Sequence, residues 1–426
     1  MNALVQYFAR QAQFKPTLDT MPESDLGIAV VIPCFAEPDL CKSLYSIAQC
    51  TMPSCKVEVI VVVNCSENVT EKEKDLSNQN ILDVKRASKE VGGEKLSFHV
   101  IRKLDLPHKY SGVGVARKYG MDEATYRFMK INNPRGIIDC FDADALCDSN
   151  YFVELYSLFS NNKSLDGCSI YYEHPLEGKD FSEDIYRGIA RYELHLRYYN
   201  QACRYAELPY AYHTIGSNMA CTAESYAKVG GMVKNKAGED FYFLQKIILN
   251  GNFGELNSTR GIPSPRVSYR VPFGTGKAIL KMQEQNDYSF LTYELEAFDV
   301  VKRAVSTARL LYRTSEKETK MAYKGLDEKF KYLIPEEEFC TAISGANSNA
   351  TSQKIYERRF FTWFSAFRLM RYLNDAHGQN IFSRQRVESE VMKLLKRKGI
   401  AAGDLDAREL LLIFRKIERN ASNFKS

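Results

Sequence analysis

The sequence contains no run of apolar residues long enough to span a membrane. None of its segments approaches the roughly 18 uninterrupted apolar residues that a membrane-spanning helix requires. Arg10 interrupts the stretch that a secretory signal would keep apolar, and no small-residue cleavage site follows it. We therefore expect a cytoplasmic protein, and contact with the inner face of a membrane is left open.

Paired metal-binding cysteines are also missing. The 11 cysteines are scattered, and pairs such as Cys34/Cys41 and Cys50/Cys55 have neither the CxxC spacing of a zinc site nor a cluster of histidines nearby. This pattern favours buried, free thiols in a reducing compartment.

The chain lacks a strong excess of one charge as well. Lys and Arg total 58 and Asp and Glu total 53, which leaves a formal net charge of +5. This excess is too small to predict nucleic-acid binding, and the first two thirds of the chain show no clustered basic and aromatic patch. Apolar residues make up 45% and charged residues 26% of the 426 residues, an ordinary globular balance for a chain of about two domains.

Short β-branched runs alternate with helix-patterned stretches in the first two thirds of the chain, which predicts βα units and a largely parallel sheet. The expected strands are 28–32, which Pro33 ends, 57–63, with Asn64 at its tip, 96–101 and 136–141. Runs this apolar are typical of strands covered on both faces. Ligands of open α/β sheets bind at the carboxyl ends of the strands, so the residues that follow these strands are the first candidates for a site.

After about residue 285 the chain becomes rich in Leu, Arg, Lys and Glu at helical spacing, over 290–335 and 354–420, with no convincing strand. The segment 337–353, with Gly345 and several Ser and Asn residues, is interpreted as a loop. The basic stretch 384–398 is interpreted as a solvated helix face rather than a patch for a membrane or an acceptor. The predicted domains are a helical extension over 1–25, an α/β domain over 26–285 and a mainly helical region over 286–426.

The strongest candidate for chemistry is the sequence GIIDCFDADALCDSNY. Asp142 and Asp144 follow an apolar strand, with only Ala143 between them. In extended chain the two side chains point the same way, and a turn would also keep them close, so either conformation lets them share Mn²⁺ or Mg²⁺ with phosphate oxygens and water. The structural alternative is that both aspartates cap a helix beginning near Ser149.

A second acidic pair, Glu239–Asp240, opens a helical segment over 241–250. Acidic residues stabilise a helix N-terminus through its dipole, so this pair has a structural explanation of its own.

The order of the motifs resembles the GT-A glycosyltransferases, specifically the family 2 type. The resemblance covers about residues 26–280 and depends on five segments in sequence: VVIPCFAEPDL, VEVIVVVNCSEN, GVGVARKYG, the DAD strand and GEDFYFLQKI. It implies a GT-A fold, Rossmann-like with a mostly parallel sheet, and the last third of the chain is not covered. A nucleotidyltransferase would carry a Gly-rich loop with Arg after the first strand, and CFAEPDL is not such a loop.

The resemblance implies roles for individual residues. The nucleotide-binding residues would be Pro33, Phe35, Glu37, Asn64, Arg117 and Asp142. Asn64 stands where the family usually has an Asp against the base, which leaves the base open. Arg117 would lie near the diphosphate at the start of a helix, whose dipole favours anions.

The remaining implied roles concern the metal and the reaction. Asp142 and Asp144 would hold Mn²⁺ or Mg²⁺, and His213 could complete the metal shell, although a lone His is more often an ordinary hydrogen-bonded residue. Asp240 would be the general base of an inverting transfer, with Glu239 orienting it. Arg270 could close over the diphosphate, with a surface turn as the equal alternative.

The function implied is transfer of a sugar from a nucleoside diphosphate, with UDP favoured over GDP, to a hydroxyl group of a glycan or a lipid-linked acceptor. A retaining transferase and a catalytically silent protein that binds nucleotide sugars are the alternatives.

Overall fold

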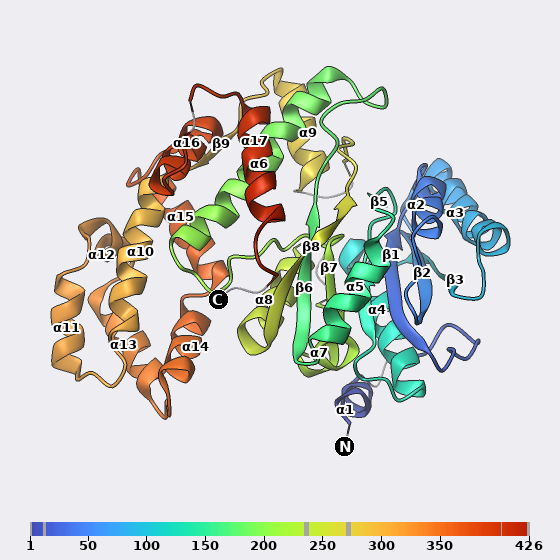
Figure 1. Cartoon of the computed structure of the whole chain (residues 1–426), viewed down its shortest axis with the longest axis horizontal. Coiled ribbons are helices and arrows are strands. Elements are labelled where there is room, and N and C mark those ends of the chain that lie inside the picture. Colours follow the sequence, from blue (N-terminus) through green and yellow to red (C-terminus); the bar gives the residue numbers. More distant parts are fainter. Residues whose placement is uncertain (1, 12–13, 234–237, 270–273, 402, 424–426) are drawn as a thin grey trace. The chain divides into compact units, whose positions relative to one another are not determined.

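The computed structural model describes residues 2–11, 14–233, 238–269, 274–401 and 403–423. The chain forms two compact units, each built from separate segments (Figure 1). The first unit consists of Met1–Ser182, Thr214–Leu280 and Arg415–Ser426, and the second of Glu183–His213 and Lys281–Phe414.

An eight-stranded sheet lies at the centre of the first unit. Its strands are β1 (Leu26–Cys34), β2 (Lys56–Ser66), β3 (Leu96–Leu106), β4 (Ile137–Cys140), β5 (Leu146–Cys147), β6 (Leu165–Tyr172), β7 (Met219–Thr222) and β8 (Asn252–Ile262). They are ordered β3-β2-β1-β4-β7-β6-β8-β5. The first four strands of this order are parallel, β7 is antiparallel to both β4 and β6, and β8 is parallel to β6. The carboxyl ends of β1, β4 and β8 therefore meet at one edge of the sheet.

Helices cover both faces of this sheet, as its apolar strands predict. The helical segments of the first unit are α1 (Ala3–Arg10), α2 (Leu40–Ala48), α3 (Glu71–Glu90), η1 (His108–Tyr110), α4 (Val113–Lys130), α5 (Tyr151–Asn161), α7 (Ala223–Lys228) and α8 (Glu239–Asn250). Helices α2, α3 and α5 share one buried core with alternate residues of β1 and β2. Helix α4 packs on the opposite face, where a Cβ on Gly120 would lie 2.3 Å from a methyl carbon of Val31.

The second unit is mainly helical. It contains α6 (Glu183–Tyr205), α10 (Leu295–Arg309), α11 (Glu316–Lys324), α12 (Glu328–Leu333), α13 (Glu336–Asn347), α14 (Gln353–Trp363), α15 (Ala366–Gly378) and α16 (Val387–Arg397). Two further helices, α9 (Thr275–Gln285) and α17 (Ala407–Arg419), each contain a sequence boundary between the units. The predicted fold class is confirmed: an α/β part with a mostly parallel sheet is joined to a helical C-terminal part.

Two expectations for the helical region are wrong. Strands β9 (Leu291–Tyr293) and β10 (Arg384–Arg386) form a small antiparallel sheet, although no strand was expected. Most of the segment interpreted as a loop forms α13, because Phe339, Ile343 and Ala346 recur at helical spacing and are buried on one face, and only 348–352 lie outside a helix. Its Ser, Asn and Gly residues gave a local loop signal that this burial overrides.

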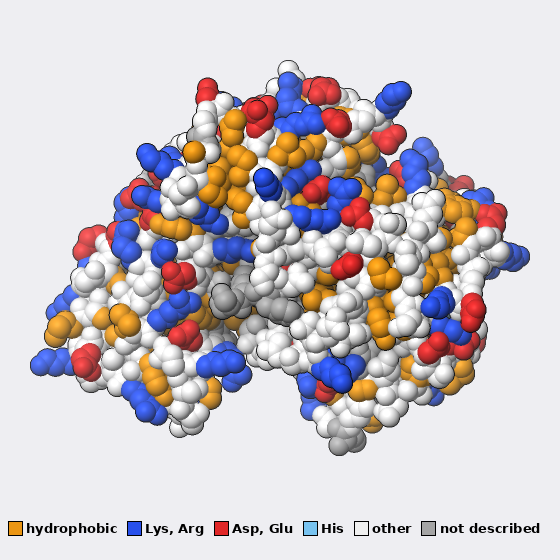
Figure 2. Space-filling view, in the orientation of Figure 1, with side chains coloured by type: hydrophobic (Ala, Val, Ile, Leu, Met, Phe, Trp, Pro, Cys, Tyr) orange, Lys and Arg blue, Asp and Glu red, His pale blue; other side chains and the backbone are white. Residues whose placement is uncertain are grey.

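The distribution of surface charge and the state of the cysteines are those expected from the sequence. On the described part of the face in Figure 2, acidic and basic side chains are interspersed, in keeping with the small net charge. The cysteines are free thiols, most of them buried. Within the described ranges, the chain forms no helix with the length and apolar character needed to cross a bilayer.

Candidate active site

The two aspartates of the DAD sequence lie in a tight turn after β4, which is one of the two predicted conformations. The amide of Ala145 donates to the carbonyl oxygen of Asp142 at 3.2 Å and closes the turn. The hydroxyl of Ser43, on α2, lies 3.1 and 2.8 Å from the carbonyl oxygens of Asp142 and Ala145. The side chains of Asp142 and Asp144 are 36% and 27% exposed. Helix α5 uses Asn150 as its N-cap, so the capping alternative for the aspartates is wrong.

Arg117 of α4 joins two of the predicted motifs through its buried guanidinium group. Its Nη2 donates to Oδ1 of Asp142 at 3.0 Å, and its Nη1 donates to Oε1 of Glu239. Arg117 is 3% exposed and Glu239 is 2% exposed. Gly216 leaves room for this group, since a Cβ there would lie 2.6 Å from Nη1. Buried charges are tolerated when they are paired, so the buried Arg117 and Glu239 need one another, and the partly exposed Asp142 is a second partner of the same guanidinium group.

Asp240 lies beside this cluster in the first turn of α8, which begins two residues before the predicted 241–250. Its Oδ1 accepts the backbone N–H of Phe241 at 2.7 Å, and the backbone of Gly216 also hydrogen-bonds to its carboxylate. Burial raises the pKa of Asp240 above its usual value, and the positive charge of Arg117 opposes this shift. Because Arg117 already holds Glu239, Asp240 is the better placed of the pair to accept a proton.

A second arginine, Arg266, pairs with two carboxylates of the site, and no sequence pattern singled it out. Its Nη1 and Nη2 donate to the two carboxylate oxygens of Glu37 at 2.8 and 2.6 Å. Its Nη2 also donates to Oδ2 of Asp144 at 2.9 Å. Arg266 shortly follows β8, whose carboxyl end lies at the same edge as those of β1 and β4. The sequence does place a basic residue shortly after this strand. That residue can be assigned to the site only when the strands whose carboxyl ends share an edge are known.

Glu37 is held in place from its backbone as well. Its N–H donates to Oδ1 of Asn80 at 2.8 Å, and Nδ2 of Asn80 donates to its carbonyl oxygen at 2.7 Å. The preceding residue, Ala36, has a φ of 44°, in the left-handed region that alanine rarely adopts. Strain of this kind is often kept at functional sites. The carboxylate of Glu37 contacts Arg266, and its contact with a nucleoside stays a prediction.

Pro33 and Asn64 lie within strands rather than after them, which corrects the predicted strand ends. The parallel ladder between β1 and β2 continues through Pro33, and β2 continues beyond Asn64. Asn64 is 3% exposed, and its Nδ2 donates to the carbonyl oxygen of Gly112 at 3.1 Å. Phe35 is half-buried against the core. Asn64 therefore fastens the N-cap residue of α4, and contact of these residues with a base stays a prediction.

The donor set at the DAD turn fits a metal ion that is bound together with phosphate. Among the described residues, no three His, Cys, Asp or Glu side chains come together in a way that could hold a metal ion. His213 belongs to the segments of the second unit, and its ligation of a metal stays a prediction. The DAD turn therefore has only two carboxylates, those of Asp142 and Asp144, to offer a metal ion. Two are enough for Mg²⁺, because it commonly takes its other ligands from water and substrate phosphates. Arg270 lies outside the described residues.

Strand β4 also carries Asp139, a fully buried carboxyl group. The hydroxyl of Tyr151 donates to its Oδ1 at 3.1 Å. Its Oδ2 has no hydrogen-bond partner among the described residues. Burial raises the pKa of Asp139 from 3.8 to about 7. Because ionisation is disfavoured in the folded chain, Asp139 lowers stability as the pH rises from about 4 through about 7.

We expect the change in the free energy of unfolding caused by Asp139→Asn to be more favourable at pH 8 than at pH 5, by about 3 kcal/mol. Asparagine keeps the oxygen that accepts from Tyr151 but cannot ionise. Thermal unfolding at the two pH values checks this, with Asp75→Asn, an exposed position on α3, as the control. Equal changes in melting temperature at both pH values would contradict the raised pKa.

No protein-family model and no curated protein matches this chain. One solved structure that resembles this chain is that of residues 1–349 of S. aureus TarS in complex with UDP-GlcNAc. The two sequences are 13% identical, the match covers 78% of this chain and 89% of that chain, and the TM-score is 0.39. Another is the structure of the mannosyltransferase PcManGT from Pyrobaculum calidifontis in complex with GDP-Man and Mn²⁺. It is also 13% identical, the match covers 98% of this chain and 94% of that chain, and the TM-score is 0.35.

Proposed function

We propose that this chain is a metal-dependent glycosyltransferase that moves a sugar from a nucleoside diphosphate to a hydroxyl group with inversion. The observation that carries the proposal is the meeting of Asp142 and Glu239, next to Asp240, on the guanidinium group of Arg117. These residues come from three of the motifs that resemble the GT-A enzymes. A strand-end turn and a helix start that served only the local fold would not need a shared buried arginine.

The charges of the cluster suit a diphosphate and a cation. Asp142 and Asp144 would hold Mn²⁺ or Mg²⁺, which, when bound, neutralises negative charge on the leaving nucleoside diphosphate. Arg117 keeps Asp142 in position by holding its Oδ1. Arg266 places a positive charge against Asp144, at the edge where the phosphates would lie.

Asp240 would act as the base. As the acceptor oxygen bonds to the anomeric carbon, the bond from that carbon to the diphosphate oxygen breaks, and the hydroxyl proton passes to the carboxylate of Asp240. The raised pKa of Asp240 makes its carboxylate a stronger base than an exposed aspartate. The rate should therefore rise with pH through the pKa of Asp240.

We further propose that the donor is a UDP-sugar or a GDP-sugar, with UDP favoured, and that the acceptor is a glycan or a lipid-linked saccharide. The resemblance of the motif order supports this choice of substrates. The free cysteines support work in a reducing compartment, the cytoplasm.

A thermal-shift panel tests the proposal directly. We expect UDP or GDP to raise the melting temperature in the presence of Mn²⁺ and to do so less in its absence. A ligand at one hundred times its Kd stabilises the folded state by roughly 2.7 kcal/mol, which is enough to detect. Adenosine and cytidine diphosphates serve as comparison ligands. No shift with any nucleoside diphosphate, with or without Mn²⁺, would contradict nucleotide-sugar transfer.

A further inference from the structure

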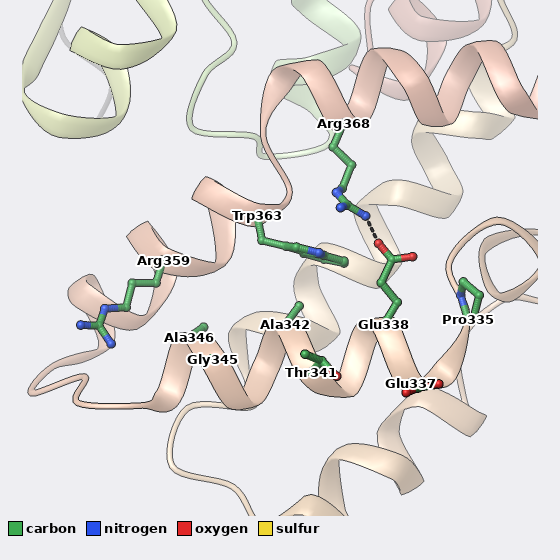
Figure 3. Close-up of a pocket in the computed structure, with 10 residues that line it drawn as sticks. All are labelled: Pro335, Glu337, Glu338, Thr341, Ala342, Gly345, Ala346, Arg359, Trp363 and Arg368. Atoms are coloured by element: carbon green, nitrogen blue, oxygen red, sulfur yellow. Dashed lines mark hydrogen bonds and ion pairs between the residues drawn. The ribbon is translucent and has the colours of Figure 1, made fainter. Parts of the chain in front are cut away.

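The helical unit contains a cavity of about 660 Å³ that lies between α13 and α14 and reaches the start of α15 (Figure 3). The residues that line it are Pro335, Glu337, Glu338, Thr341, Ala342, Gly345, Ala346, Arg359, Trp363 and Arg368. None of them belongs to the motifs that carry the proposed transfer.

An aromatic ring forms one wall of this cavity, and small side chains form the wall that faces it. The ring belongs to Trp363, the single tryptophan of the chain, which is half-buried. Figure 3 shows the indole over the surface of α13, where Ala342, Gly345 and Ala346 provide little bulk. The space between them is a slot with one aromatic face, which suits a flat ring of modest thickness.

Charged groups at the rim of the slot balance one another. Glu337 and Glu338 contribute two carboxylates, and Arg359 and Arg368 contribute two guanidinium groups. Arg368 reaches from α15 to pair with Glu338, and its guanidinium carbon lies 4.6 Å from the centre of the Trp363 ring. This pair positions donors and acceptors beside the ring without adding net charge.

A phosphate-bearing ligand is disfavoured here. The first turn of α13 carries Glu336, Glu337 and Glu338, so carboxylates already occupy the end of the helix that would otherwise attract an anion. A cationic ligand meets two arginines. The ligand class that fits is an uncharged ring with many hydroxyl groups: its C–H face packs on the indole, and its hydroxyls donate to the carboxylates and accept from the guanidinium groups.

We propose that this cavity is a binding site for a neutral saccharide. As a step that rests on the proposed function, the saccharide that binds here belongs to the same chemical class as the proposed glycan acceptor. Saccharide binding itself does not depend on that step.

Because Trp363 is the only tryptophan, excitation of tryptophan fluorescence reports on this cavity alone. The full chain is titrated with maltohexaose, cellohexaose and chitohexaose as neutral probes, and with inorganic phosphate as the anionic control. We expect a saturable change in emission with at least one hexasaccharide and none with phosphate. Emission that no hexasaccharide changes would overturn the proposal, as would a change caused by phosphate alone.

Two variants separate a specific site from a general effect. Ala342→Leu fills the slot and keeps the reporter, and it should weaken the fluorescence response by roughly tenfold in Kd. Trp363→Ala should weaken binding measured by calorimetry to a similar extent. Tyr332→Ala, an aromatic side chain that is 69% exposed in the same unit and does not line the cavity, is the matched control. Circular dichroism confirms that each variant is folded, and undiminished affinity in both cavity variants would overturn the site.

The outcome is distinguishable from that of the thermal-shift panel. If nucleoside diphosphates fail to stabilise the chain but a hexasaccharide binds, the transfer proposal is wrong and the cavity remains a saccharide site. If the nucleotides stabilise the chain and no saccharide changes the emission, the cavity proposal alone is wrong.

Discussion

Asp240→Asn is expected to bind the nucleoside diphosphate with Mn²⁺ as the unmodified chain does, and to transfer sugar roughly 10²–10⁴ times more slowly. Asparagine keeps an oxygen that can accept the N–H of Phe241, so the start of α8 should be preserved. The amide cannot accept the proton of the acceptor hydroxyl. The measurement is single-turnover transfer with the donor that the thermal-shift panel identifies.

The pH profile provides a second readout for Asp240. Burial raises its pKa, so transfer by the unmodified chain should rise with pH through a pKa above that of an exposed aspartate, and the variant should lack this rise. Asp75→Asn, on the exposed surface of α3, is the control for the substitution itself. Transfer at an undiminished rate in Asp240→Asn would remove Asp240 as the base.

Loss of metal-dependent nucleotide binding is expected for Asp142→Ala and for Asp144→Ala. Each substitution removes one of the two carboxylates that the DAD turn offers to a cation. The fold should persist, because Arg117 keeps Glu239 and Arg266 keeps Glu37 as a partner. Neither arginine would be left as an unpaired charge in the protein.

Calorimetric titration with nucleotide, in the presence and absence of Mn²⁺, measures this effect. The heat that depends on Mn²⁺ should disappear in both variants and remain in Asp75→Ala, the exposed control. Nucleotide binding with Mn²⁺ that is equal in all of these chains would show that the DAD turn holds no metal.

The first four strands of the sheet along the chain could be predicted from the sequence, and β5 to β8 were not. A strand covered on both faces needs a continuous apolar run, which is a local signal. The runs around Val30 and Ile60 are of this kind, and β1 and β2 lie where they were expected. The strand ends were less accurate. The parallel ladder carries Pro33 and Asn64 inside the sheet, and pairing with a neighbouring strand is not encoded within either segment.

The motifs of the site could be recognised one by one, but not their contacts. Asp142 was singled out from its place after a strand, and the roles of Glu239 and Arg117 were implied by the resemblance of the motif order. The ion pairs of Arg117 with Asp142 and Glu239 form only because three segments fold against the same edge of the sheet. Arg266 shows the limit most clearly, because its partners Glu37 and Asp144 are distant in sequence. Its place after β8 points to the site only once the strands that share an edge are known.

By itself, the amino-acid sequence determined the class of the fold, the apolar strands and the acidic residues at their ends, because these follow from local patterns of burial and charge. Only the tertiary structure decided that Arg117 and Arg266 hold those acids, that Asp139 is buried with one oxygen lacking a partner among the described residues, and that α13 forms a wall of a cavity with Trp363. The physical reason is the same in each case. Ion pairs, desolvation and cavities depend on which distant segments meet, and that is settled by the packing of the whole unit rather than by any stretch of the chain.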